Sequence, residues 1–315
     1  IHFPHFNVPV FCPTKFIVTI HDLILTKFPT MRATTLGHFF YKIKSWAYKA
    51  VIWLAIKRAK KIIAVSEFTK NDIVSQFGVK PEKIVVTYEG VANLAKGRDS
   101  LFVAKLDDKK TLSGYNINSP FLLYVGNAYP HKNLEGLVRA FGKIYKADKN
   151  LTLVLVGKED YFYKRIKEYA IGLGLWKEEK SPLPPFYKGG NSPIIFPGYV
   201  GDAELEILFQ KAIAYVFPSL YEGFGLPPLE AMAKGCPVAS SNKASMPEIL
   251  GSAAVYFNPE DEREMEEQII RVIRDENLRA GLVKRGYEQV KKYNWWECAR
   301  KTLEVYEEVL RRQNV

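Results

Sequence analysis

Residues 221–230, which read YEGFGLPPLE, hold the chain's densest set of groups that could do chemistry. The apolar run at 212–218 predicts a strand directly before them. The two prolines favour a helix that begins near Pro227 and ends at Gly235. Because proline has no N–H, the open backbone donors belong to the residues of the turn, Gly223, Phe224, Gly225 and Leu226. Donors at the positive end of a helix suit a phosphate group.

Two carboxylates bracket this turn, Glu222 before it and Glu230 within the predicted helix. A carboxylate accepts several hydrogen bonds and therefore suits the vicinal hydroxyls of a sugar. A phosphate cradle flanked by two such groups predicts a site for a nucleotide sugar. The alternative is a pair of acidic residues that only complements the dipole of the helix.

Basic side chains follow other predicted strands. Lys132 stands in Pro-His-Lys-Asn at 130–133, between Gly126 and a helix start, where a point charge would stabilise a departing diphosphate. His131 beside it would add charge only when protonated. Lys158 is a weaker candidate for the same anion. Each of these residues has a simpler interpretation, a solvated lysine or a histidine at a helix start.

His21 ends another predicted strand and is a candidate for a hydrogen bond to a sugar hydroxyl. The simpler interpretation is a structural histidine, with Asp22 as the cap of the next turn. Gly198, Tyr199 and Val200 also follow a strand, and the simpler interpretation there is a turn that needs glycine.

Apolar runs alternate with amphipathic segments along the chain. The predicted strands are residues 16–20, 61–65, 84–87, 121–125, 151–156, 194–196, 214–217, 238–240 and 254–257. The predicted helices are residues 38–61, 66–77, 133–145, 161–173, 202–212, 227–235, 261–275, 278–291 and 296–313. Residues 93–119 are interpreted as a linker and 177–193 as a surface insertion. Alternation of this kind predicts α/β architecture with parallel, doubly wound sheets, in which ligands bind beyond the carboxyl ends of the strands.

The charge of the chain is uneven. Residues 1–115 hold 18 Lys and Arg against 8 Asp and Glu, so they account for +10 of the net +11. Seven of these basic residues and no acidic one lie between His38 and Ser66. Such a field favours anionic partners. Three cysteines without metal-ligand spacing favour reduced thiols and a cytoplasmic setting.

Five stretches, in the right order along the chain, resemble the retaining GT-B glycosyltransferases of family 4. The most informative is the 221–230 segment, which continues as Ala-Met-Ala-Lys-Gly-Cys-Pro-Val. The others are residues 19–23, 64–68, 124–134 and 196–200. The resemblance covers nearly the whole chain. It implies two Rossmann-like doubly wound domains that face each other across a cleft.

The resemblance also implies roles for the candidate residues. Glu222 contacts the hydroxyls of the donor sugar, and Glu230 takes the ribose of the nucleotide. His21 lies near the donor sugar and the acceptor, and Tyr199 and Val200 lie beside the base. Many members of the family carry arginine where this chain has Asn127 and His131, so Lys132 is the one cation that the pattern secures.

We therefore expect a metal-independent hexosyltransferase without a cofactor, acting with retention on a glycan or lipid-linked acceptor, with mannose as the preferred sugar. Neither an Asp-x-Asp motif for a metal nor a signature for nucleic-acid binding is seen. A GT-B epimerase and a non-catalytic nucleotide-sugar binder are the alternatives. The helix predicted at 38–61, with Trp46 and Trp53, could contact an anionic membrane at the inner face of the cell membrane, although a core helix with a solvated charged face is the simpler interpretation.

Three segments are expected: an acceptor-side domain at 1–115, a nucleotide-sugar domain at 116–294, and a final helix at 295–315 that packs back on the first domain. The abrupt start, Ile-His-Phe-Pro, leads us to expect that the first domain lacks its earliest strands and that its acceptor site is incomplete.

Overall fold

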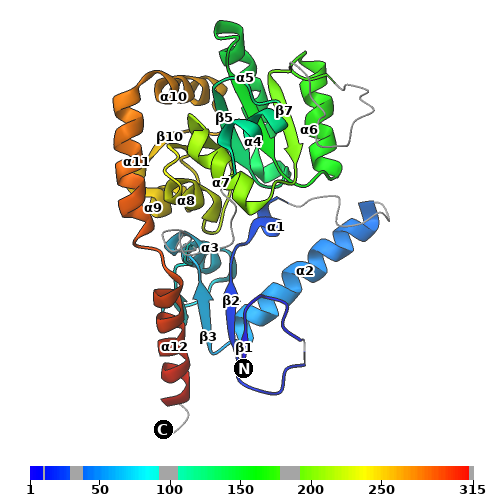
Figure 1. Cartoon of the computed structure of the whole chain (residues 1–315). Helices are drawn as coiled ribbons and strands as arrows, with labels where there is room; N and C mark the ends of the chain where they lie inside the picture. Colours follow the sequence, from blue (N-terminus) through cyan, green and yellow to red (C-terminus); the bar gives the residue numbers. More distant parts are fainter. Residues whose placement is uncertain (10, 29–37, 92–105, 178–191, 312–315) are drawn as a thin grey trace.

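The computed structural model describes residues 1–9, 11–28, 38–91, 106–177 and 192–311, with the backbone alone at 38–45. These residues form two α/β domains, each built on a parallel sheet (Figure 1). The predicted α/β, doubly wound fold is therefore confirmed.

The first sheet has four parallel strands in the order β1-β2-β3-β4. They are β1 (His2–Phe3), β2 (Ile17–Ile20), β3 (Lys61–Ala64) and β4 (Ile84–Val86). The helices around it are α1 (Ile24–Lys27), α2 (His38–Arg58) and α3 (Glu67–Phe77). As the sequence predicts, Ser66 caps α3, and its hydroxyl accepts a hydrogen bond from the N–H of Thr69. The two-residue β1 was not predicted, because a strand so short leaves no period in the sequence.

Helices cover both faces of the first sheet. One face packs against α2 and α3 through Ile52, Ile56 and Ile73. On the other face lies α12 (Trp295–Arg311), whose Val305 joins Ile17 and Ile63 in a separate cluster. The last helix of the chain thus lies beside β3 (Figure 1).

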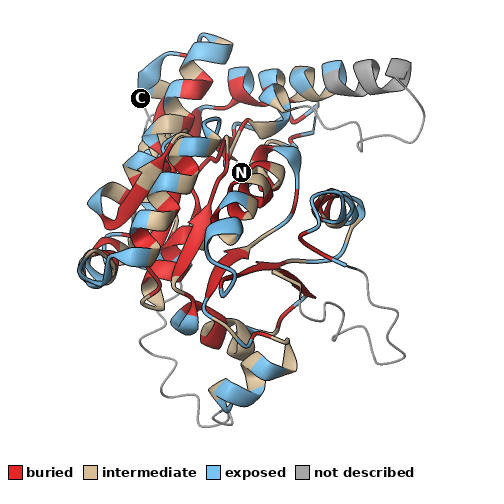
Figure 2. Ribbon diagram, turned by 90° about the horizontal axis from the view of Figure 1, so that it is seen from above, coloured by how far each residue is buried: buried red, intermediate tan, exposed pale blue. Residues whose placement is uncertain are grey.

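The second sheet has six parallel strands in the order β10-β9-β8-β5-β6-β7. They are β5 (Phe121–Val125), β6 (Thr152–Val156), β7 (Ile194–Gly198), β8 (Ala214–Phe217), β9 (Val238–Ser241) and β10 (Ala254–Phe257). Their residues are almost all buried, which explains why they read as continuous apolar runs. Figure 2 shows these buried strands between helices whose outer sides are exposed.

The helices of the second domain follow the strands in turn. They are α5 (Leu134–Ala147), α6 (Tyr161–Gly172), α7 (Asp202–Lys211), α8 (Leu226–Ala233), α9 (Met246–Leu250), α10 (Glu262–Arg274) and α11 (Glu276–Val290). Of these, α10 packs against α5 and α11 packs against α8. The short α9 was not predicted.

Two segments differ in detail from what the sequence predicts. The predicted linker contains α4 (Asp108–Gly114), which Asp107 caps by accepting a hydrogen bond from the N–H of Lys110 and which packs against α7. The spacing of apolar residues along 38–61, close to 3.6, predicts that Trp46 lies on the buried face of α2, but Trp46 is 74% exposed while Ile52 and Ile56 are buried. This helix is apolar on most sides, so its sequence does not fix the buried face. Most of the predicted insertion, residues 178–191, and residues 93–105 of the predicted linker lie outside the described residues.

Candidate active site

The glycine turn joins β8 to α8 and needs both of its glycines. Gly225 directly precedes α8 with a φ of +102°, and a Cβ there would lie 2.2 Å from the methyl carbon of Met246. A Cβ on Gly223 would lie 1.9 Å from the backbone oxygen of His21. The second domain's turn is therefore in backbone contact with the end of β2 in the first domain.

Hydroxyl groups hold three successive carbonyls of this turn. Ser245 donates to the carbonyls of Glu222 and Phe224, at 3.1 and 3.0 Å. The carbonyl of Gly223 between them accepts from Ser66 at 2.6 Å and from Thr69 at 3.1 Å. Within the described residues no hydrogen bond is seen from the N–H groups of residues 223–226. Such donors at the start of a helix fit an anion.

Lys132 and Glu222 form a buried ion pair beside the turn. The ammonium nitrogen lies 2.5 Å from Oε1 of Glu222, and the two side chains are 12% and 10% exposed. The ammonium also lies 5.3 Å from the centre of the Phe217 ring. The structure thus brings together two residues that stand 90 positions apart in the sequence.

Left-handed backbone at Asn133 places Lys132. Asn133 has a φ of +56°, which ends a 3₁₀ turn over Pro130–Lys132 and begins α5. Asparagine tolerates this conformation better than most residues do. Its side-chain amide donates to the carbonyl of Pro259 at 2.7 Å and fixes the turn.

His131 supplies no second positive charge. Its side chain is buried, and burial together with the neighbouring Lys132 lowers its pKa to about 3. The imidazole is therefore neutral at pH 7. Its Nδ1 and the hydroxyl of Ser219 have no hydrogen-bond partner among the described residues. His131 would add charge to the site only if it were protonated, and in this environment it is not protonated at pH 7.

Gly126 follows β5, and its carbonyl accepts a hydrogen bond from the hydroxyl of Tyr163 at 2.8 Å. A Cβ on Gly126, where φ is +152°, would lie 2.8 Å from the hydroxyl of Tyr124. Asn127 is exposed beside it, and its side-chain oxygen accepts from the N–H of Tyr129 at 3.3 Å. The glycine therefore leaves room for the hydroxyl of Tyr124, and Asn127 is exposed.

His21 is held by two acceptors, neither of which the sequence suggested. Its Nδ1 lies 2.8 Å from the carboxylate of Glu89 and its Nε2 lies 3.0 Å from the carbonyl of Pro4. The hydrogen bond to Glu89 is the main cause that raises the pKa of His21. Glu89 follows β4 as His21 follows β2, so its place at the carboxyl edge of the same sheet is the signal that would have found it.

Among the described residues, no hydrogen bond or ion pair joins the remaining candidates to Lys132 or Glu222. Glu230 is exposed, and partial desolvation together with the charge of Asp202 raises its pKa. Tyr199 is 74% exposed and lines a hollow between α4 and α7. Val200 is buried and Lys158 is exposed.

In the part of the chain that the structure describes, no three His, Cys, Asp or Glu side chains gather as metal ligands. None of its helices has the length and apolar character needed to cross a membrane.

Solved structures define the class of this fold. A sucrose-phosphate synthase from Thermosynechococcus elongatus superposes with a TM-score of 0.73 at 21% identity, over 99% of this chain and 73% of that one. HepE of Anabaena, solved with UDP and glucose, superposes with a TM-score of 0.69 at 18% identity, over 93% of this chain and 71% of that one. The glycosyltransferase WaaG gives a TM-score of 0.68 at 15% identity, over 92% of this chain and 74% of that one. The two domains have the GT-B fold.

Sequence comparison then gives the family. The family model "Glycosyltransferase Family 4" matches residues 1–92, and "Glycosyl transferases group 1" matches residues 119–275. The chain belongs to these group 1, family 4 glycosyltransferases.

Two curated relatives are mannosyltransferases. O-antigen chain mannosyltransferase B of Escherichia coli is 28% identical over 311 residues, which are 97% of this chain and 73% of that protein. O-antigen chain mannosyltransferase RfbU of Salmonella typhimurium is 29% identical over 259 residues, 81% of this chain and 64% of that protein. The chain thus spans about two thirds to three quarters of the length of these relatives.

Proposed function

We propose that this chain transfers a hexose, with mannose as the preferred case, from a nucleotide diphosphate sugar to a hydroxyl group of a glycan or lipid-linked acceptor, with retention and without a metal ion. The observation that carries the proposal is the buried pair of Lys132 and Glu222 beside the unbonded N–H groups of the glycine turn. The names of the two mannosyltransferase relatives support the choice of sugar.

The diphosphate of the donor binds between Lys132 and the N–H groups at the start of α8. As the bond to the sugar breaks, negative charge grows on the departing phosphate, and a fixed cation with fixed dipoles stabilises it without rearrangement. Before the donor arrives, Glu222 neutralises Lys132 at 2.5 Å. The diphosphate therefore takes the place of Glu222 on the ammonium and frees that carboxylate for the hydroxyls of the sugar.

Glu230 binds the ribose. Its side chain is exposed and forms no hydrogen bond among the described residues, so both oxygens are open to a ligand. A neighbouring diol can donate to both. HepE, a protein with the same fold, was solved with UDP and glucose, which supports a nucleotide-sugar donor for this chain.

His21 lies on the acceptor side. Both of its ring nitrogens face acceptors, so the imidazolium form satisfies Glu89 and the carbonyl of Pro4 together. Since the backbone of His21 lies against Gly223, the end of β2 lies next to the turn. We assign His21 to the sugar side of the site, where a ring N–H can donate to a sugar hydroxyl in place of the carbonyl of Pro4.

A cytoplasmic site of action at an anionic membrane surface fits the remaining features. In α2, Trp46 and Trp53 are 74% and 48% exposed, and Lys49 and Lys57 are exposed beside them. Exposed tryptophan and lysine side chains on one helix offer apolar and cationic contacts to such a surface.

The experiment is a thermal-stability screen of the chain with UDP, GDP and a single-stranded oligonucleotide, followed by calorimetry of Glu230→Gln. A ligand that binds only the folded protein raises its melting temperature. Loss of a charged hydrogen bond of about 1.5–3 kcal/mol predicts a nucleotide affinity about 10- to 100-fold lower in the variant. Glu168→Gln, at an exposed position on α6, is the matched control and keeps the affinity of the parent.

Stabilisation by the oligonucleotide alone, or equal nucleotide affinity in both variants, contradicts the proposal. Binding of a nucleotide sugar without transfer to any acceptor in a panel of glycans supports the non-catalytic alternative instead.

A further inference from the structure

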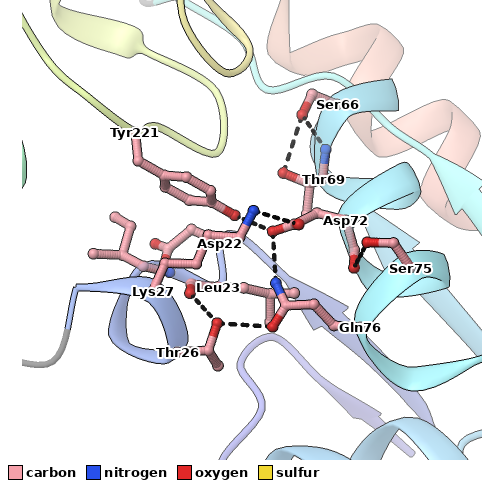
Figure 3. A network of polar contacts seen from close by, with 11 residues as sticks. Asp22, Leu23, Thr26, Lys27, Ser66, Thr69, Asp72, Ser75, Gln76 and Tyr221 are labelled. Carbon is pink, nitrogen blue, oxygen red and sulfur yellow. Dashed lines mark hydrogen bonds and ion pairs between the residues drawn. The ribbon is translucent and has the colours of Figure 1, made fainter. Parts of the chain in front are cut away.

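Helix α3 of the first domain reaches the donor turn of the second domain through a buried carboxylate. Figure 3 shows Tyr221 with its hydroxyl donating to Asp72. Asp72 is 6% exposed and also accepts from Lys27 at 2.7 Å and from Gln76 at 2.9 Å. Tyr221 is itself buried, and the ammonium of Lys27 lies 5.0 Å from the centre of its ring. The residue directly before Glu222 is thus anchored to the first domain.

The residue directly after Glu222 is anchored to the same helix. The carbonyl of Gly223 accepts from the hydroxyl of Ser66 at 2.6 Å and from that of Thr69 at 3.1 Å. Both hydroxyl residues are fully buried. From the second domain, Glu248 accepts hydrogen bonds from the N–H groups of Glu67 and Phe68, at 2.7 and 2.9 Å, and holds the start of α3 against the turn.

Glu222 therefore lies between two anchored neighbours. Fixing the residue on each side limits the backbone dihedrals of Glu222, and its carboxylate meets Lys132 in one position. Preorganisation matters at such a site, because a displacement of about 1 Å can lower a rate about 100-fold.

We propose that Asp72, Ser66 and Thr69 are positioning residues for Glu222, so that the first domain sets how the second domain holds the donor sugar. The inference rests on the proposed role of Glu222 in binding that sugar. It assigns to the acceptor-side domain a part in recognising the donor. The three residues act on Glu222 through Tyr221 and Gly223, with which they form hydrogen bonds.

Two conservative variants and one control separate positioning from a general structural role. Tyr221→Phe removes one hydroxyl and leaves Asp72 paired with Lys27 and Gln76. Thr69→Val replaces a hydroxyl by a methyl group of similar volume, on the other side of Glu222. The control is Gln76→Ala. Gln76 is exposed one turn further along α3, and the substitution removes a different donor to Asp72.

The first readout needs no ligand. The amide of Leu220 donates to the carbonyl of His131 at 2.7 Å and reports whether the turn stays in place. Loss of an anchor lowers the free energy of local opening, so we expect hydrogen exchange of this amide to be about tenfold faster or more in Tyr221→Phe and Thr69→Val. We expect the rate in Gln76→Ala to equal that of the parent.

The second readout is calorimetry with GDP and GDP-mannose, and with UDP and UDP-glucose. We expect the two variants to keep nucleotide affinity within about twofold and to lose the additional affinity that the sugar supplies. A general loss of stability would not produce this split. Equal exchange of the Leu220 amide in Tyr221→Phe, Thr69→Val and Gln76→Ala overturns the inference. If the parent binds no nucleotide, the proposed function fails, while the exchange measurement still decides whether α3 positions the turn.

Discussion

The ion pair between Lys132 and Glu222 gives a quantitative prediction of stability. Its side chains are 12% and 10% exposed, with the charged atoms 2.5 Å apart, so it belongs with buried pairs. Removing one partner of a buried pair leaves an uncompensated charge and costs about 3–5 kcal/mol, whereas replacing both partners is often close to neutral. We expect Lys132→Met and Glu222→Gln each to lower the free energy of unfolding by about 3–5 kcal/mol. The double variant should lose no more than the worse single variant.

The assay is a double-mutant cycle measured by urea unfolding. The matched control is the exposed pair of Arg263 and Glu267 on α10, whose nitrogen and oxygen lie 2.9 Å apart with side chains 85% and 57% exposed. We expect a coupling energy of about 3 kcal/mol for the buried pair and of about 0.5 kcal/mol or less for the control. A buried-pair coupling no larger than that of the control would refute the reasoning, because Lys132 would then be a solvated surface lysine.

Three further predictions concern the surroundings of this pair. NMR titration should place the pKa of His21 above 6.5, and Glu89→Gln should lower that pKa, so a parent value at or below 6.5 would be inconsistent with the contact. The stability that this contact supplies is full below pH 6.5 and is lost as the pH rises through the folded-state pKa. The buried imidazole of His131, whose folded-state pKa is about 3, is neutral above pH 6.5, and the stability that depends on the neutral form is lost as the pH falls toward 3. The free energy of unfolding should therefore decline less over that range in His131→Phe than in the parent, and identical declines would contradict a neutral buried imidazole. Gly223→Ala should abolish nucleotide binding, because its Cβ meets the backbone oxygen of His21 at 1.9 Å, whereas Gly172→Ala, with nothing within 4 Å, should bind as the parent does; equal binding in both variants would show that the turn tolerates a side chain.

The sequence predicts the second domain better than the first. The bounds of β5, β8 and β10 agree with the predicted ranges, since strands buried on both faces leave uninterrupted apolar runs between turns. In the first domain, β1 is two residues long and exists through its pairing with β2, with His2 opposite Ile17. No local pattern encodes a contact of that kind.

In the candidate site, too, local patterns are predicted from the sequence and tertiary contacts are not. The turn at 221–230 and Lys132 belong to local patterns, and their residue types indicate what they can bind. Their partners are set by tertiary structure. The pairing of Lys132 with Glu222 joins the turns that follow β5 and β8, which are neighbours in the sheet but far apart in sequence. Glu89 was missed for this reason. So was Asp72, which reads as an ordinary charged residue of an amphipathic helix until Tyr221 is seen against it.

The most direct test of the central claim is a crystal structure of the chain with GDP or UDP bound. The account predicts the diphosphate between the ammonium of Lys132 and the N–H groups at the start of α8, with the ribose hydroxyls on Glu230 and the carboxylate of Glu222 released from its contact at 2.5 Å. A nucleotide bound elsewhere, with the pair of Lys132 and Glu222 intact, would contradict it.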